Sequence, residues 1–120
     1  MDKIKVLKIE PNKRPEVAFV ENSLKSFQTL VNGYIETVTL EDDVVMIVDM
    51  EGKLKNNPQG NRRFRDDIIA GTMLITGRDG IHLTSLSDEN IKKYSEMFAE
   101  PDDISPEEIQ LHIGWLFRPF

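Results

Sequence analysis

The sequence predicts an α+β domain with a single, mainly antiparallel sheet of five or six strands and two or three helices packed on it. Two apolar runs, 44–48 and 68–75, lack polar alternation, which is typical of strands covered on both faces. We expect both runs at the centre of one sheet. Polar turns between the other apolar segments favour antiparallel hairpins, and three serine or asparagine capping signals indicate helices.

Length and composition indicate one small domain. The chain has 120 residues, 39% of them hydrophobic, which suffices for one core and is too short for two ordinary domains. We expect residues 1–100 to form a single α+β domain. Residues 101–120 should add a C-terminal helix and an aromatic tail that pack on this domain or extend from it. The sequence has no signal-peptide core and no run of 18 apolar residues, so we expect a soluble protein.

The N-terminal residues predict a β-hairpin. Residues 4–9 change their apolar phase at Leu7, which suggests a bulge or a twist in the first strand. A proline-bounded turn at 10–15 leads to a short second strand at 17–20. We expect this second strand to pair back on the first.

A first helix follows, with Asn22 or Ser23 as its capping residue and Gly33 as its left-handed stop. Its apolar residues recur at three- and four-residue spacings, which places them on one stripe that should cover the sheet. These residues are Leu24, Phe27, Leu30 and Val31.

The middle of the chain predicts the remaining strands. Residues 34–40 and the run 44–48 flank a three-residue polar turn, as in a hairpin. Within the run 68–75, Gly71 indicates a bulge or a close approach of the backbone to another group. After an Asp-Gly turn, residues 81–84 should form a short returning strand.

A second helix begins after Ser87, which serves as its cap, with Leu86 and Ile91 as a hydrophobic staple. Its expected buried stripe is Ile91, Tyr94, Met97 and Phe98. A third, shorter helix begins after Ser105, with proline at its first position and a glutamate three residues after the cap, and should end near Gly114.

The segment 53–65 carries five basic residues, no acidic residue, and turn formers in its middle. Arginine grips phosphate or carboxylate in a bidentate manner, and backbone N–H groups near Gly60 would also face an anion. We therefore predict an anion or ligand site formed by Asn61, Arg62, Arg63 and Arg65, with Tyr34 as a stacking ring. A flexible, solvated loop explains the same residues equally well.

Residues 87–110 hold eight acidic residues against two lysines. They are either solvated helix faces or a surface that captures a basic protein partner by electrostatic steering. The predicted partner surface is Glu100, Asp102, Asp103, Glu107, Glu108, Trp115 and Phe117. The aromatic tail, which also includes Phe120, either anchors that partner or folds back onto the sheet. The net charge of −6 argues against direct binding of nucleic acid.

The sequence offers no activated nucleophile, because it has no cysteine, no nucleophile elbow, and two histidines, His82 and His112, that lie far apart. We expect a protein that is not an enzyme. Carboxylates near strand ends, such as those at 41–43 and 66–67, lack the ordered spacing of a cation site. Solvated turns are favoured there, and we expect neither a metal site nor a cofactor.

Several segments, taken as an ordered set, resemble a known family. They are residues 5–11, 30–36, 51–54, Pro58, 61–62, 67–72 and 83–89. Together they resemble the phage and conjugative-element family catalogued as domain of unknown function 3846, and the similarity covers roughly residues 4–98. The resemblance implies a bacterial mobile-element habitat and supplies no catalytic residues. Residues 101–120 lie outside the family pattern.

These observations lead to two functional hypotheses. The first is a non-catalytic phage or mobile-element protein that inhibits a host defence of the CRISPR or restriction type. It would contact a nucleic-acid-handling nuclease through its acidic surface, in the host cytoplasm and without binding nucleic acid or membrane. The alternative is a small-molecule binding module, such as a sponge for a nucleotide signal, that uses the basic loop 53–65. An open edge strand would allow a homodimer in either case.

Overall fold

A computed structural model describes residues 2–114 of the chain. The expected aromatic tail, with Trp115, Phe117 and Phe120, lies outside the described residues. In chain order the elements are β1 (Lys3–Ile9), β2 (Glu16–Glu21), α1 (Leu24–Val31), β3 (Ile35–Glu41), β4 (Val44–Asp49), the 3-10 turn η1 (Gly52–Leu54), β5 (Gly60–Phe64), β6 (Asp67–Ala70), β7 (Met73–Asp79), β8 (His82–Thr84), α2 (Asp88–Met97) and α3 (Pro106–Gly114).

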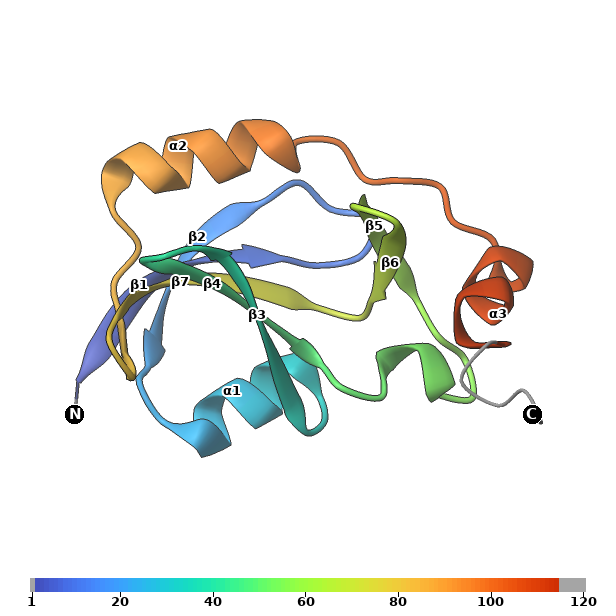
Figure 1. Cartoon of the computed structure of the whole chain (residues 1–120), viewed down its shortest axis with the longest axis horizontal. Coiled ribbons are helices and arrows are strands. Elements are labelled where there is room, and N and C mark those ends of the chain that lie inside the picture. The colour runs from blue at the N-terminus through green and yellow to red at the C-terminus, as the bar shows by residue number, and fades with distance from the viewer. Residues whose placement is uncertain (1, 115–120) are drawn as a thin grey trace.

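Six strands form one antiparallel sheet in the order β2-β1-β7-β4-β3, with β8 paired to β7. α1 and α2 lie on opposite faces of this sheet (Figure 1). The remaining strands, β5 and β6, pair with each other as a separate hairpin. The α+β prediction and its mainly antiparallel sheet are therefore confirmed.

Each face of the sheet carries its own apolar core. Phe27 and Val31 of α1 pack on one face with Ile47 and Leu74 of the central strands. Tyr94 and Phe98, at the end of α2, pack on the other face with a set that includes Leu7, Ile9, Met46 and Ile75. Every residue of β4 is buried, as its continuous apolar run predicts.

The change of apolar phase in β1 is not caused by a bulge. The pairing of β1 with β2 runs from Lys3 to Lys8 without a register shift. Ile4 packs in the core under α1, whereas Leu7 packs in the core under α2. Of the two predicted causes, a bulge or a twist, the bulge is therefore wrong. The apolar phase changes because Ile4 and Val6 are buried on one face of the sheet, whereas Leu7 and Ile9 are buried on the other.

The apolar run 68–75 was predicted to be one central strand, and this prediction is wrong. Gly71 adopts a φ of 87°, which favours glycine, and its N–H donates to the carbonyl of Gln59. The chain turns there, so that β6 pairs with β5 and only β7 enters the main sheet. The end of the basic segment 53–65, expected as a loop, is likewise ordered as β5.

The helix ends agree with the sequence in most respects. Ser23 and Ser87 cap α1 and α2 by accepting hydrogen bonds from backbone N–H groups three residues ahead. The left-handed residue after α1 is Asn32, at φ 63°, rather than Gly33. Gly33 is needed for space instead, because a Cβ there would lie 2.5 Å from Oδ1 of Asp49.

Met97 was expected in the buried stripe of α2, but its side chain is 55% exposed. At about 100° per residue, Met97 lies about 120° around the helix from Ile91, whereas Phe98 returns to within about 20° of it. Tyr94 and Phe98 are buried, at 3% and 4% exposure. The stripe is therefore narrower than the sequence analysis expected.

The molecule is elongated, with extents of 43 × 27 × 24 Å. The β5–β6 hairpin, η1 and α3 gather at one end of the sheet (Figure 1). Within residues 2–114, no helix is long and apolar enough to cross a lipid bilayer.

Candidate functional site

Asn61 lies inside the protein, with no exposed surface. Its side-chain amide donates to the carbonyls of Ile9 and Gly71, both at 2.8 Å. β5 has a register irregularity between Gly60 and Arg62, which explains how two consecutive residues of this strand both point inward. Asn61 thus pins the hairpin to the end of β1.

Arg62 is also buried, with 1% of its surface exposed. Its guanidinium donates to the carbonyl of Phe98 at 3.0 Å, to that of Lys13 at 2.6 Å, and to the side-chain oxygen of Asn61 at 2.7 Å. Burial lowers the pKa of Arg62, against the opposing effect of nearby carboxylates. Its donors join three segments of the chain, so little of this side chain is accessible to a ligand.

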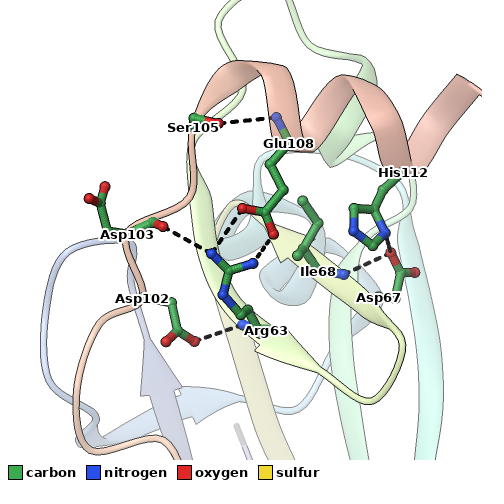
Figure 2. A network of polar contacts seen from close by, with 8 residues as sticks. All are labelled: Arg63, Asp67, Ile68, Asp102, Asp103, Ser105, Glu108 and His112. Atoms are coloured by element: carbon green, nitrogen blue, oxygen red, sulfur yellow. Dashed lines mark hydrogen bonds and ion pairs between the residues drawn. The ribbon is translucent and has the colours of Figure 1, made fainter.

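Arg63 faces outward and contacts the acidic segment (Figure 2). Its backbone N–H donates to Asp102 Oδ2 at 2.8 Å, and its guanidinium donates to the Asp103 carbonyl at 3.1 Å. The same guanidinium forms an ion pair with Glu108. We call this set of contacts the Arg63 clasp. One residue of the predicted basic site, Arg63, therefore binds residues of the predicted acidic site.

The other predicted acidic residues are distributed differently. Glu100 forms an ion pair with Arg14 at 2.5 Å. The backbone N–H of Glu108 donates to Ser105 Oγ at 3.1 Å, so the predicted cap of α3 is present, although the Glu108 side chain points to Arg63. Glu107 is exposed. Trp115 and Phe117 lie outside residues 2–114.

A pocket of about 550 Å³ lies beside the small hairpin. Its walls come from β3 and β4 of the main sheet, η1, the β5–β6 hairpin and α3. Apolar and ionisable side chains both line it. The apolar set is Val38, Val48, Met50, Leu54, Phe64, Ile68, Ile69 and Ala70, and the ionisable set is Glu36, Asp49, Lys53, Arg65, Asp67 and His112.

Asp67 organises the basic groups of the pocket. Its Oδ1 accepts from Lys53 Nζ at 2.6 Å. The same oxygen accepts from the Ile68 N–H at 2.7 Å and lies 3.3 Å from Nδ1 of His112 (Figure 2). Burial acts to raise the pKa of Asp67, but the hydrogen bonds and charges of its partners outweigh burial, so the pKa is lowered. The carboxylate is therefore ionised at neutral pH, and it holds Lys53 by a hydrogen bond with His112 close by.

Arg65 occupies the turn between β5 and β6 and has a left-handed φ of 55°, which is uncommon for a residue with a side chain. Its guanidinium carbon lies 4.6 Å from the ring centroid of Phe64. Within residues 2–114, the Arg65 side chain makes no hydrogen bond or ion pair to another residue. Of the predicted anion-binding residues, Arg65 is therefore the one whose donors are available at the pocket.

Tyr34 is not brought to this site. It is 67% exposed and lines a separate, shallower depression of about 270 Å³ with residues of α1.

The sequence did not predict most of the pocket. Lys53 lay within the predicted basic segment, but Asp67 was interpreted as a solvated turn residue. No local pattern could connect His112, from α3, to residues of the hairpin.

The fold and the pocket define a small α+β protein with a cavity between its main sheet and an added hairpin. The model of the family described as Domain of unknown function (DUF3846) matches residues 4–99, and the chain belongs to that family. No curated protein and no solved structure matches the chain. The matched residues include the whole pocket lining except His112.

Proposed function

We propose that this chain is a non-catalytic binding protein that holds a small organic anion, in the first instance a nucleotide, in the pocket beside the hairpin. The pocket itself carries this proposal. Its volume of about 550 Å³ lies within the range of about 300–1,000 Å³ that is typical of small-molecule sites. An apolar interior with a few polar groups is also typical of such sites.

Three side chains of the pocket can donate to an anionic ligand, although the lining also holds the carboxylates Glu36, Asp49 and Asp67. Lys53 and His112 both lie beside Asp67, and Arg65 has a guanidinium that makes no hydrogen bond or ion pair within residues 2–114. A guanidinium binds phosphate or carboxylate through two parallel hydrogen bonds. The ring of Phe64 and the aliphatic side chains offer an apolar surface for the body of the ligand.

The family resemblance implies a mobile-element habitat, in which binding of a nucleotide would serve to counter a host defence. A protein that captures a nucleotide signal without converting it lowers the free concentration of that signal. Such a sponge would weaken a host defence that depends on the signal. The role needs affinity and abundance, and it needs no catalytic group.

A thermal-shift screen of the full chain tests the proposal. The probes are nucleoside mono-, di- and triphosphates and cyclic and linear dinucleotides. A ligand that binds only the folded state stabilises it by mass action, so at least one probe should raise the melting temperature. Arg65→Ala should reduce that rise, whereas the exposed Lys92→Ala serves as a matched control and should not. A panel with no stabilising member, or an unchanged rise in Arg65→Ala, would contradict the proposal.

A second candidate is inhibition of a host defence nuclease by protein contact. The observation in its favour is that Asp103 and Glu107 have exposed side chains with no ion pair inside residues 2–114. Glu100 and Glu108 are less suited to this role, because each is already paired with an arginine.

Binding of a purified nuclease tests this second candidate. The affinity should fall with rising salt and with Asp103→Lys combined with Glu107→Lys, since exposed charges act through screened electrostatics. Asp79→Lys, at the far end of β7, is the matched control. Equal affinity for the double variant and the control would exclude the acidic surface.

A further inference from the structure

The pocket has one wall that does not belong to the family domain. The family model ends at residue 99, whereas α3 spans Pro106–Gly114. His112 of α3 nevertheless lines the pocket and lies 3.3 Å from Oδ1 of Asp67. A segment beyond the family domain therefore completes a cavity whose other lining residues all lie inside it.

α3 is docked firmly enough to serve as a fixed wall. Ile109 and Ile113 are buried, at 1% and 7% exposure. Ile104, just before the helix, packs closely on Gly60. A Cβ added to Gly60 would lie 2.7 Å from the Cβ of Ile104. The Arg63 clasp adds polar contacts on the same side.

His112 faces the Asp67 carboxylate, with Nδ1 at 3.3 Å from Oδ1. A carboxylate at one ring nitrogen of a histidine fixes the ring orientation and leaves the other nitrogen to act elsewhere. The other nitrogen, Nε2, has no hydrogen-bond partner within residues 2–114. The His112 side chain is 29% exposed, so a molecule in the pocket can reach it.

We propose that the segment 100–114 determines which anion this pocket selects, and that His112 contacts the bound anion directly. This inference rests on the proposed function. The family domain supplies the apolar interior together with Lys53 and Arg65, which provide general affinity for an anion. The wall formed by α3 supplies a contact that depends on the shape and hydrogen-bonding groups of the ligand, and so discriminates between anions.

Isothermal titration of the full chain with the two tightest-binding nucleotides of the screen tests the inference. The variants are His112→Ala and, as a matched control, Leu111→Ala, whose side chain is 79% exposed. Loss of one hydrogen bond to a charged ligand changes affinity by about tenfold or more, and only for the nucleotide that makes it. The ratio of the two Kd values should therefore change about tenfold in His112→Ala and stay at the wild-type value in Leu111→Ala.

The outcomes separate the two proposals. An unchanged Kd ratio in His112→Ala, with binding abolished in Arg65→Ala, would overturn the selectivity role of α3 and leave the binding function intact. Equal weakening of both nucleotides would also overturn it, because a purely structural effect is not selective. If the wild type binds no nucleotide, the proposed function fails and this inference fails with it. Should His112→Ala melt much below the wild type, His112→Gln replaces it in the same comparison.

Discussion

Arg63 and Glu108, 45 positions apart in the chain, form an ion pair that joins the hairpin to α3. Each belongs to a segment whose charge suggested an external partner: a basic loop for an anion and an acidic helix for a protein. In the structure each is the partner of the other. The Arg63 clasp therefore joins members of the two predicted binding sites in an internal contact, and the pocket beside it is the main candidate site.

The ion pair should contribute little to global stability. Arg63 is 48% exposed and Glu108 28%, so solvent screens their interaction. In a double-mutant cycle with Arg63→Ala and Glu108→Ala, we expect a coupling free energy of about 0.5–1 kcal/mol from urea unfolding. The coupling should shrink at high salt. Zero coupling at low salt would mean that the ion pair does not hold α3.

Arg62 should be far more sensitive than Arg63. Its guanidinium makes hydrogen bonds to two other chain segments, at Lys13 and Phe98, and to the neighbouring Asn61, and lysine cannot reproduce that planar set of donors. We therefore expect Arg62→Lys to lower the free energy of unfolding by about 3 kcal/mol, measured by urea denaturation. Arg65→Lys, on the exposed turn, is the control and should stay within about 0.5 kcal/mol of the wild type. Equal effects of the two substitutions would contradict the structural role of Arg62.

The contact between Tyr94 and Glu41 predicts a dependence of stability on low pH. The Tyr94 hydroxyl donates to Glu41, and this bond, with a second from Lys93, lowers the pKa of Glu41 from 4.5. Because the folded pKa is lowered, the stabilisation is complete above pH 4.5 and is lost as the pH falls through the folded value. The difference in unfolding free energy between wild type and Tyr94→Phe should therefore narrow on acidification. A constant difference across this range would contradict the contact.

The same contact also predicts that stability falls as the pH rises above 10. Burial and then the Glu41 carboxylate raise the pKa of Tyr94 above its ordinary value of 10.0. Above pH 10 the unfolded tyrosine ionises while the folded one stays protonated, so the stabilisation is lost as the pH rises. Ultraviolet absorbance of the tyrosines, followed as the pH is raised, measures how many of them ionise and checks this prediction. Tyr94 should ionise only when the protein unfolds. Ionisation of Tyr94 in the folded protein near pH 10 would contradict the contact.

Gly60→Ala should loosen α3. The added Cβ would lie 2.7 Å from Ile104 Cβ, which a small side-chain rotation cannot relieve. We expect a loss of about 1–3 kcal/mol and faster amide hydrogen exchange in α3. Gly71→Ala is the control, since its φ of 87° adds strain with no atom within 4 Å. If both variants exchange alike in α3, Ile104 does not hold the helix.

The main sheet could be predicted because its signals are local. β4 is a continuous apolar run, and Ser23, Ser87 and Ser105 lie at the helix starts, where their hydroxyls accept backbone hydrogen bonds. The break at Gly71 was visible as a glycine in a strand, but its consequence was not. Whether such a glycine makes a bulge or a turn depends on which strands lie nearby.

The site was harder to predict, because charge in a sequence does not show where its partner lies. The sequence placed Asn61, Arg62 and Arg63 in one predicted anion site. In the structure, Asn61 and Arg62 are buried, and Arg63 forms an ion pair with Glu108 of α3. The irregularity in β5 that turns Asn61 and Arg62 inward has no local signal. His112 enters the pocket only through the packing of α3, which depends on contacts between distant residues.

The central claim is that a small anion binds in the pocket beside the hairpin. Titration of the 15N-labelled full chain with the tightest nucleotide of the screen, followed by amide chemical shifts, tests it most directly. The account predicts saturable shifts that cluster at Lys53, Arg65, Asp67, Ile69 and His112. No shifts, or shifts confined to the depression at Tyr34 or to residues 100–108, would contradict it.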